Sequence, residues 1–106
     1  MTKLPESVRV GPITYKIVLS PNMHEGRNDL DGAIRYSAET IEIDGSVADA
    51  TAVQTLWHEI LHEILQHAGR RKQSERWVDS TAYGLMQVVV DNPELIEITR
   101  EVVKKK

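Results

Sequence analysis

Thr55-Leu56-Trp57-His58-Glu59-Ile60-Leu61-His62-Glu63-Ile64-Leu65 is the stretch that decides the fold, because it combines an apolar helical pattern with a pair of histidines. Residues four apart lie on one face of a helix, so His58 and His62 can present two imidazole nitrogens to one metal ion. Glu59 lies beside them, and HExxH is typical of zinc metallopeptidases, whose glutamate takes a proton from water. We therefore predict zinc ligands at His58 and His62 and a general base at Glu59.

The apolar residues around this motif predict which side of the helix is buried. At about 100° per residue they form one continuous arc, and both histidines lie just past its edge. The arc consists of Val53, Trp57, Ile60, Leu61, Ile64, Leu65 and Ala68. We expect a helix over about residues 49–68, with Ser46 or Asp49 as its N-cap and Gly69 as its C-terminal stop.

The residues before this helix predict a small sheet. Apolar and polar residues alternate over 8–10 and 13–18 around Gly11-Pro12, which predicts one hairpin. The same alternation over 32–37 and 40–44 predicts a second hairpin. We therefore expect an antiparallel sheet of three or four strands, within about residues 7–44, packed on the motif helix.

The residues after the motif helix predict two more helices. A charged turn over 70–74 leaves room only for an antiparallel return into a second helix over about 75–90. Asn92 and Pro93 begin a short final helix that fades into the lysine-rich tail, 92–106. The chain thus predicts one α+β domain over residues 1–106, with a minimal set of elements.

Composition narrows the class of protein. A chain of 106 residues with 41% hydrophobic residues can bury one core but has little length for a deep cleft. It has no cysteine, so a metal must be held by histidine and carboxylate groups. The net charge of −3 argues against general nucleic-acid binding. Without an apolar run of about 20 residues or a signal-peptide pattern, we expect a cytoplasmic protein that does not bind membranes.

The second helix offers two carboxylates as a third metal ligand. If the helices pack antiparallel about the turn, His62 lies level with about residue 80, which favours Asp79. Side-chain reach instead favours Glu75, since glutamate is one methylene longer. We prefer Asp79 and keep Glu75 as the alternative.

Other polar residues of the chain are weaker or open candidates for the site. His67 is not the third histidine of the longer metzincin motif, which would need a histidine at position 68 and a glycine at position 65. We interpret Glu63 as a surface charge. Tyr83, His24 and Tyr36 are the candidates for stabilising an oxyanion, and the sequence does not choose among them.

The chain resembles the small phage and prophage zincin-like proteins, which are related to the ImmA/IrrE-type metallopeptidases. The resemblance rests on HEILH, on the pair Glu75 and Asp79 that follows it, and on an Asp-Asn-Pro stop at 91–93. It implies a zincin-like α+β fold and a zinc held by His58, His62 and an acidic residue of the second helix. Where relatives are expected to carry glutamate, this chain has Asp79. In other enzymes with this E-x-x-x-D pattern, the glutamate binds the metal and the aspartate supports a histidine.

The sequence thus leads to a functional hypothesis with two alternatives. Zinc would lower the pKa of a water, Glu59 would accept its proton, and the hydroxide would attack a carbonyl of a peptide or protein substrate. A free strand edge at 32–37 or 40–44 could pair with an extended peptide. The first alternative is a non-catalytic zinc-binding regulatory or interaction module, and the second is a helix pair without metal. If the chain is phage-encoded, the host cytoplasm is its expected location.

Overall fold

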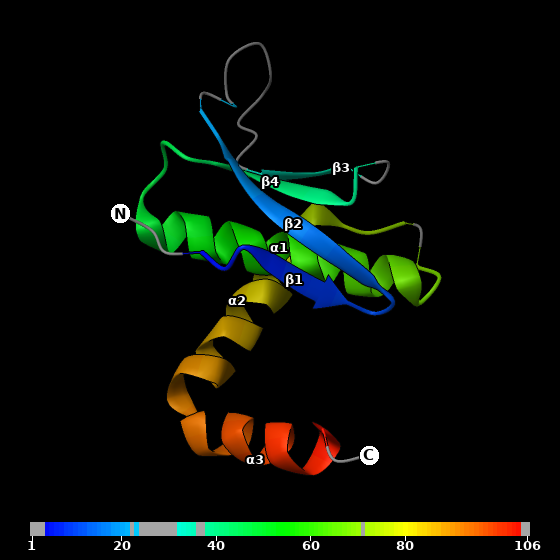
Figure 1. Ribbon diagram of the computed structural model, residues 1–106, viewed down its shortest axis with the longest axis vertical. Coiled ribbons are helices and arrows are strands. Elements are labelled where there is room, and N and C mark those ends of the chain that lie inside the picture. Colours follow the sequence, from blue (N-terminus) through cyan, green and yellow to red (C-terminus); the bar gives the residue numbers. More distant parts are fainter. Residues whose placement is uncertain (1–3, 22, 24–31, 36–37, 71, 105–106) are drawn as a thin grey trace.

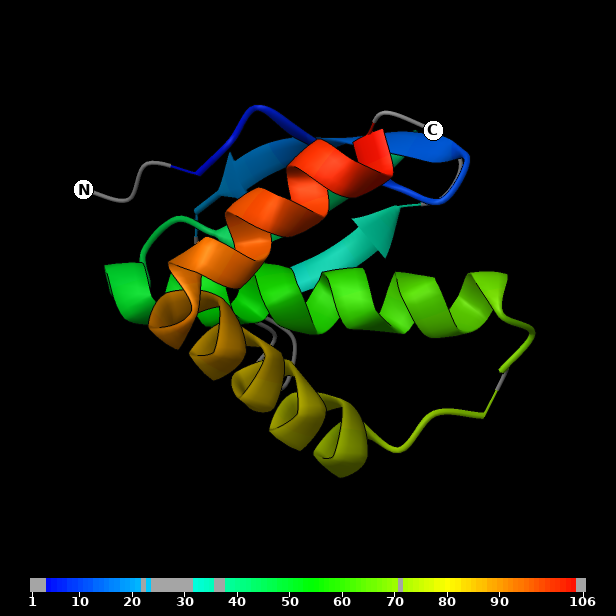
Figure 2. The same cartoon turned by 90° about the horizontal axis from the view of Figure 1, so that it is seen from below.

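A computed structural model describes residues 4–21, 23, 32–35, 38–70 and 72–104, and it has an α+β fold (Figure 1). The strands are β1 (Ser7–Val10), β2 (Ile13–Ser20), β3 (Gly32–Arg35) and β4 (Thr40–Asp44). The helices are α1 (Asp49–His67), α2 (Glu75–Asp91) and α3 (Pro93–Lys104). The sheet lies against α1, while α2 leaves α1 at a steep angle and carries α3 away from the sheet (Figures 1 and 2). The predicted α+β class and its element order are confirmed.

The sheet is mixed, so the expectation of a purely antiparallel sheet was wrong. Both predicted hairpins form, because β1 pairs antiparallel with β2 and β3 pairs antiparallel with β4. The strand order is β1-β2-β4-β3, which places β4 beside β2 in a parallel pair. The physical reason is burial. Ile41 and Ile43 of β4 are fully buried, so β4 takes the interior position and the short β3 takes the edge.

Helix α1 is covered on two sides rather than along one apolar stripe. Towards the sheet, Ala52 and Leu56 join a core with residues of β1, β2 and β4. Towards α2, Leu61 packs with Val78 and Ala82, and Trp57 and Leu65 border this second core. The predicted single arc was therefore wrong: two of its residues, Val53 and Ile64, are 36% and 46% exposed. The helix carries polar residues between its two buried faces.

The ends of α1 match the prediction at one end only. Gly69 has a φ of 86°, the left-handed conformation that ends helices, so the predicted stop is confirmed. At the other end, the N-cap is Ala48, with no side-chain hydrogen bond. Ser46 donates from its backbone N and its hydroxyl to Asp44 Oδ1, at 2.8 and 2.6 Å. Its hydroxyl therefore closes the turn after β4 instead of capping the helix.

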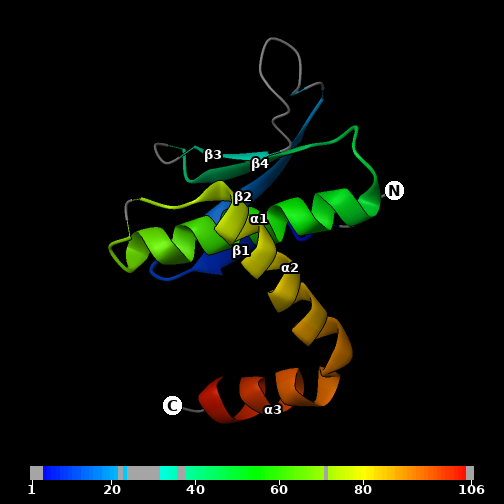
Figure 3. The ribbon, with the colours of Figure 1, turned by 180° about the vertical axis from the view of Figure 1, so that it is seen from behind.

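The C-terminal helix is longer than expected. It continues to Lys104, and no residue of α3 is buried. Figure 3 shows it as a separate arm at the far end of α2. Among the described residues, no helix combines the length and the apolar character that a membrane span requires.

Candidate metal centre

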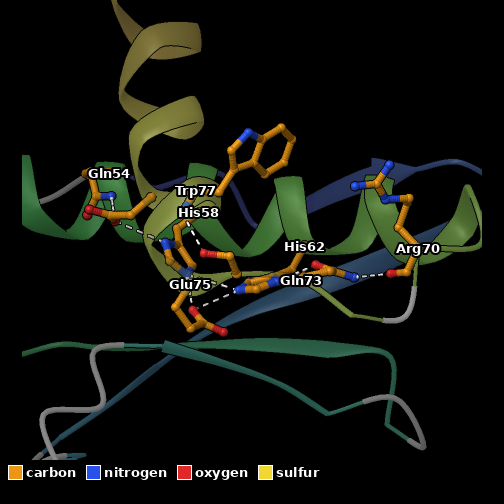
Figure 4. Close-up of polar contacts among 9 residues, drawn as sticks. Gln54, His58, His62, Arg70, Gln73, Glu75 and Trp77 are labelled. Carbon is orange, nitrogen blue, oxygen red and sulfur yellow. Dashed lines mark hydrogen bonds and ion pairs between the residues drawn. The ribbon is translucent and has the colours of Figure 1, made fainter.

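The two histidines lie at the border between the buried faces of α1. Their side chains are 15% and 17% exposed, so they are shielded without being sealed. Helix α2 begins beside them because Ser74 caps its first turn, accepting a hydrogen bond from the Trp77 backbone N at 3.2 Å. This cap places Glu75, the first residue of α2, against the histidine pair (Figure 4).

Three ligand atoms converge at this point. Glu75 Oε1 lies 2.9 Å from His58 Nε2 and 3.1 Å from His62 Nε2, and the two Nε2 atoms lie 3.1 Å apart. His58, His62 and Glu75 form the group of side chains, within the described part of the chain, that could hold a metal ion. The structure thus brings both predicted histidines together with Glu75, the alternative third ligand.

The remaining nitrogen of each ring is held by an acceptor. His58 Nδ1 lies 3.1 Å from Asp79 Oδ1, and His62 Nδ1 lies 2.6 Å from Gln73 Oε1. A carboxylate or amide oxygen only accepts, so each Nδ1 carries the hydrogen and donates it. A neutral ring in this tautomer has its Nε2 lone pair available for a metal ion, whereas a protonated ring donates from Nε2 to Glu75 Oε1. Metal-ligating histidines are held by such partners.

The two partners are themselves fixed. Gln73 Nε2 donates to the Arg70 carbonyl at 2.7 Å, which sets the orientation of the Gln73 amide. Gln54 Nε2 donates to Asp79 Oδ1 at 2.7 Å. Neither glutamine was predicted. Gln54 could have been found, because it lies one turn before His58 on the same face, whereas nothing in the pattern marks Gln73.

The preferred third ligand, Asp79, does not lie with the Nε2 atoms, and the alternative, Glu75, does. The prediction that His62 lies level with about residue 80 was wrong because it treated residues 70–74 as a tight turn. Residues 72–74 instead lie back beside α1, so Gln73 and Glu75 already reach His62. Asp79 then lies one turn further, level with Gln54 and His58.

No family model, curated protein or solved structure matches this chain.

Glu59 lies on the sheet side of the histidines and borders a pocket. This pocket has a volume of about 380 Å³ and is lined by Gly32, Ala33, Ile34, Glu59, His62, Gln73 and Glu75. A Cβ built on Gly32 would lie 2.6 Å from Thr55 Cγ2 and 3.3 Å from Glu59 Oε2. The glycine therefore lets β3 approach α1 closely enough to form one wall of the pocket.

The pKa values of the site reflect burial and opposite charges. Burial raises the pKa of Glu59, an effect that His58 and His62 oppose and Glu75 reinforces. Burial alone would lower the pKa of His62, but hydrogen bonds to Gln73 and Glu75 and the charges of Glu75 and Glu59 raise it. Burial would raise the pKa of Glu75, yet bonds to His62 and His58 lower it. Glu75 is thus held as a carboxylate.

The oxyanion candidates are not resolved by this geometry. Tyr83 lies on α2, is 56% exposed and does not line the pocket. His24 and Tyr36 lie outside the described residues. Of the pocket-lining side chains within the described residues, the Gln73 amide and the His62 ring carry N–H donors, and the His62 Nδ1 is already paired with Gln73 Oε1.

Glu63 is not a surface charge, so that interpretation was wrong. It is 1% exposed, hydrogen-bonds to the hydroxyl of the fully buried Tyr15, and lies 2.8 Å from His67 Nε2. Its Oε2 has no hydrogen-bond partner among the described residues. Viewed around the axis of α1, Glu63 lies between Leu56 and Glu59, on the side that faces the sheet. This position was the signal in the sequence that should have indicated burial.

Proposed function

We propose that this chain is a zinc-dependent metallopeptidase of the zincin-like kind. The observation that carries the proposal is the convergence of His58 Nε2, His62 Nε2 and Glu75 Oε1, with both Nδ1 atoms held by acceptors. The resemblance to small phage and prophage zincin-like proteins agrees with it. We propose that this chain, too, is encoded by a phage or prophage. Glu75, rather than Asp79, is our proposed third ligand.

The donor set fits zinc. Two imidazoles and one carboxylate are the ligands of many catalytic zinc sites, which keep a further position open. Ligand atoms around a tetrahedral zinc are about 3.3 Å apart, given bonds of about 2.0–2.2 Å. The observed separations of 2.9–3.1 Å need only a small opening. Zinc bound there would supply a Lewis acid that lowers the pKa of water towards 7.

Glu59 is the proposed general base. Its pKa is raised by burial, which brings it closer to neutral pH, where a base transfers protons most effectively. Its carboxylate borders the same pocket as His62 and Glu75. A water held in this pocket would give a proton to Glu59 as its oxygen adds to the substrate carbonyl, and Glu59 would then deliver that proton to the amine as the C–N bond breaks.

The substrate class follows from the neighbouring strand. β3 is at the edge of the sheet, and Gly32, Ala33 and Ile34 line the pocket. An extended peptide that pairs with this edge would lie beside the pocket that Glu59 borders, which would bring its carbonyl groups close to the site. We therefore propose a peptide or protein segment in extended conformation as substrate.

A second candidate is a non-catalytic zinc-binding module on the same scaffold. One observation favours it: the Gln73 amide already donates one of its two N–H groups to the Arg70 carbonyl. A tetrahedral oxyanion would then have only the second N–H of this amide as an added, uncommitted side-chain donor from the described residues of the pocket.

The experiment compares wild-type protein with Glu59→Gln, and uses Glu97→Gln as a matched exposed control. Each zinc-loaded protein is incubated with a mixture of unstructured peptides, and products are identified by mass spectrometry. The peptidase proposal expects cleavage by wild type and control and none by Glu59→Gln, with equal zinc content in all three. Zinc binding without cleavage by the wild type would support the module.

A further inference from the structure

A second pocket lies where the chain passes from α1 to α2, and we call it the linker pocket. It has a volume of about 200 Å³. Its lining consists of Leu65, Arg70, Lys72, Gln73, Ser74 and Trp77. Two of these six residues are cations and none is acidic, although the whole chain has 16 acidic and 13 basic residues. The linker pocket is therefore locally positive in a protein of net negative charge.

The end of α1 holds Arg70 at this pocket. Gly69 has a φ of 86°, its backbone N donates to the Gln66 carbonyl at 3.0 Å, and the Arg70 backbone N donates to the Leu65 carbonyl at 2.9 Å. These two bonds form the Schellman motif that ends many helices. The Arg70 carbonyl also accepts from Gln73 Nε2 at 2.7 Å. The backbone of Arg70 is thus fixed between two other lining residues of the pocket.

The two cations are not neutralised by the protein. Neither Arg70 nor Lys72 forms an ion pair with a carboxylate of the described residues. The nearest carboxylate along the chain, Glu75, is instead directed at the two histidines of the candidate metal centre. Two positive groups on one small pocket repel each other, and a carboxylate between them would offset this repulsion.

The remaining walls favour a side chain of a peptide over a free anion. Leu65 is partly buried and Trp77 is 50% exposed, so both offer apolar surface to the methylene groups of an acidic side chain. The Gln73 amide has a second N–H beyond the one that it donates to Arg70. The volume is below the roughly 300–1,000 Å³ of sites for whole small molecules, which suits a single side chain.

We propose that the linker pocket binds the carboxylate side chain of an acidic residue in a peptide. Gln73 lines this pocket and also the pocket beside Glu59, and in Figure 4 Arg70 lies beyond Gln73 on the side away from Glu75. The linker pocket is thus separate from the candidate metal centre but adjoins it. Binding there requires neither zinc nor cleavage, so the inference does not rest on the proposed peptidase activity.

The first test is a calorimetric titration with short unstructured peptides that differ only at a central residue, which is glutamate, glutamine or phosphoserine. The full chain carries Glu59→Gln, so that no peptide is consumed whether or not the wild type is a peptidase. The glutamate peptide should bind at least about tenfold more tightly than the glutamine peptide, the usual gain from hydrogen bonds to a charged group. Equal affinities for these two peptides, or a phosphoserine peptide that binds about tenfold more tightly than the glutamate peptide, would overturn the proposal.

The second test changes the cations. Arg70→Gln and Lys72→Gln should each weaken binding of the glutamate peptide about three- to tenfold, since one charged partner is lost and the backbone bonds of Arg70 are kept. Arg100→Gln on α3 and Lys16→Gln on β2 are the matched controls, because both replace exposed cations outside the linker pocket.

Arg70→Glu combined with Lys72→Glu should reverse the preference, so that a peptide with a central lysine binds more tightly than the glutamate peptide. Circular dichroism verifies that each variant keeps its helix content. Control variants that weaken binding as much as the pocket variants, or a double variant without reversed preference, would overturn the proposal.

Discussion

Glu75 Oε1 lies 2.9 Å from His58 Nε2, whereas the opposite nitrogen of the same ring faces Asp79. The two carboxylates of α2 therefore have different positions around one imidazole. A group at Nε2 shares the point where His62 Nε2 also arrives, while a group at Nδ1 can only orient the ring. This relationship is the basis for proposing Glu75 as a metal ligand and Asp79 as the residue that orients His58.

Gln73 should be required for tight zinc binding although it is not a ligand. Gln73→Leu keeps the size of the side chain and removes the acceptor for His62 Nδ1. Zinc affinity should fall about 10–100-fold, the usual effect of losing such a partner. Gln87→Leu on the exposed side of α2 is the matched control and should bind as the wild type does. Zinc affinities are measured by competition with a chelator. Equal affinities for the two variants would show that Gln73 does not support zinc binding.

Gly32 should be intolerant of a methyl group. A Cβ there would lie 2.6 Å from Thr55 Cγ2 and 3.2 Å from the Glu42 carbonyl oxygen, so β3 must move from α1. Gly32→Ala should lower the free energy of unfolding by about 1–3 kcal/mol, as overpacking does. Gly84→Ala in α2 meets nothing within 4 Å and should raise it by about 0.4–1 kcal/mol. Urea denaturation of both variants tests whether their free energies of unfolding change in opposite directions.

Glu63 should stabilise the chain through its buried contacts. Glu63→Gln weakens the interactions with Tyr15 and His67 in a site from which water is excluded. We expect the free energy of unfolding to fall by about 1–3 kcal/mol. Glu97→Gln, at an exposed position of α3, should change it by less than about 0.5 kcal/mol. Two variants of equal stability would show that Glu63 is not a structural residue.

Stability without zinc should depend on pH through Glu59. Its folded pKa is raised above the unfolded value of about 4.5, so the folded state binds the proton more tightly. This contribution to stability is complete below the unfolded pKa and is lost as pH rises through the folded pKa. Glu59→Gln removes this loss of stability because glutamine does not titrate. With a chelator present, the variant should become more stable than the wild type as pH rises to neutrality. The gain is about 1.4 kcal/mol for each unit by which the pKa is raised. A difference that is constant with pH would contradict this origin.

The sequence predicted the elements well because their signals are local. The HExxH spacing, Gly69 and the alternation around Gly11 each depend on a few neighbouring residues. Both hairpins and all three helices follow from such patterns. The parallel pairing of β2 with β4 depends on which strand is most buried, and that is a property of the whole sheet.

The sequence predicted that His58 and His62 lie close together, but it did not predict which carboxylate joins them. His58 and His62 are fixed by one helix, but the choice between Glu75 and Asp79 depends on the path of the linker. Residues 72–74 lie back beside α1, so that Gln73 reaches His62, and no local pattern encodes that path. The burial of Glu63 was missed for a related reason, since a charge was interpreted without regard to its face of the helix.

The most direct test of the central claim is a calorimetric zinc titration of chelator-treated wild type, Glu75→Ala and Asp79→Ala. Both replaced side chains are exposed, so neither change leaves a cavity. We predict one zinc per wild-type chain and no stoichiometric binding by Glu75→Ala. Asp79→Ala should still bind one zinc, about 10–100-fold more weakly. A wild type without stoichiometric zinc, or a Glu75→Ala variant with undiminished affinity, would contradict the proposed metal centre.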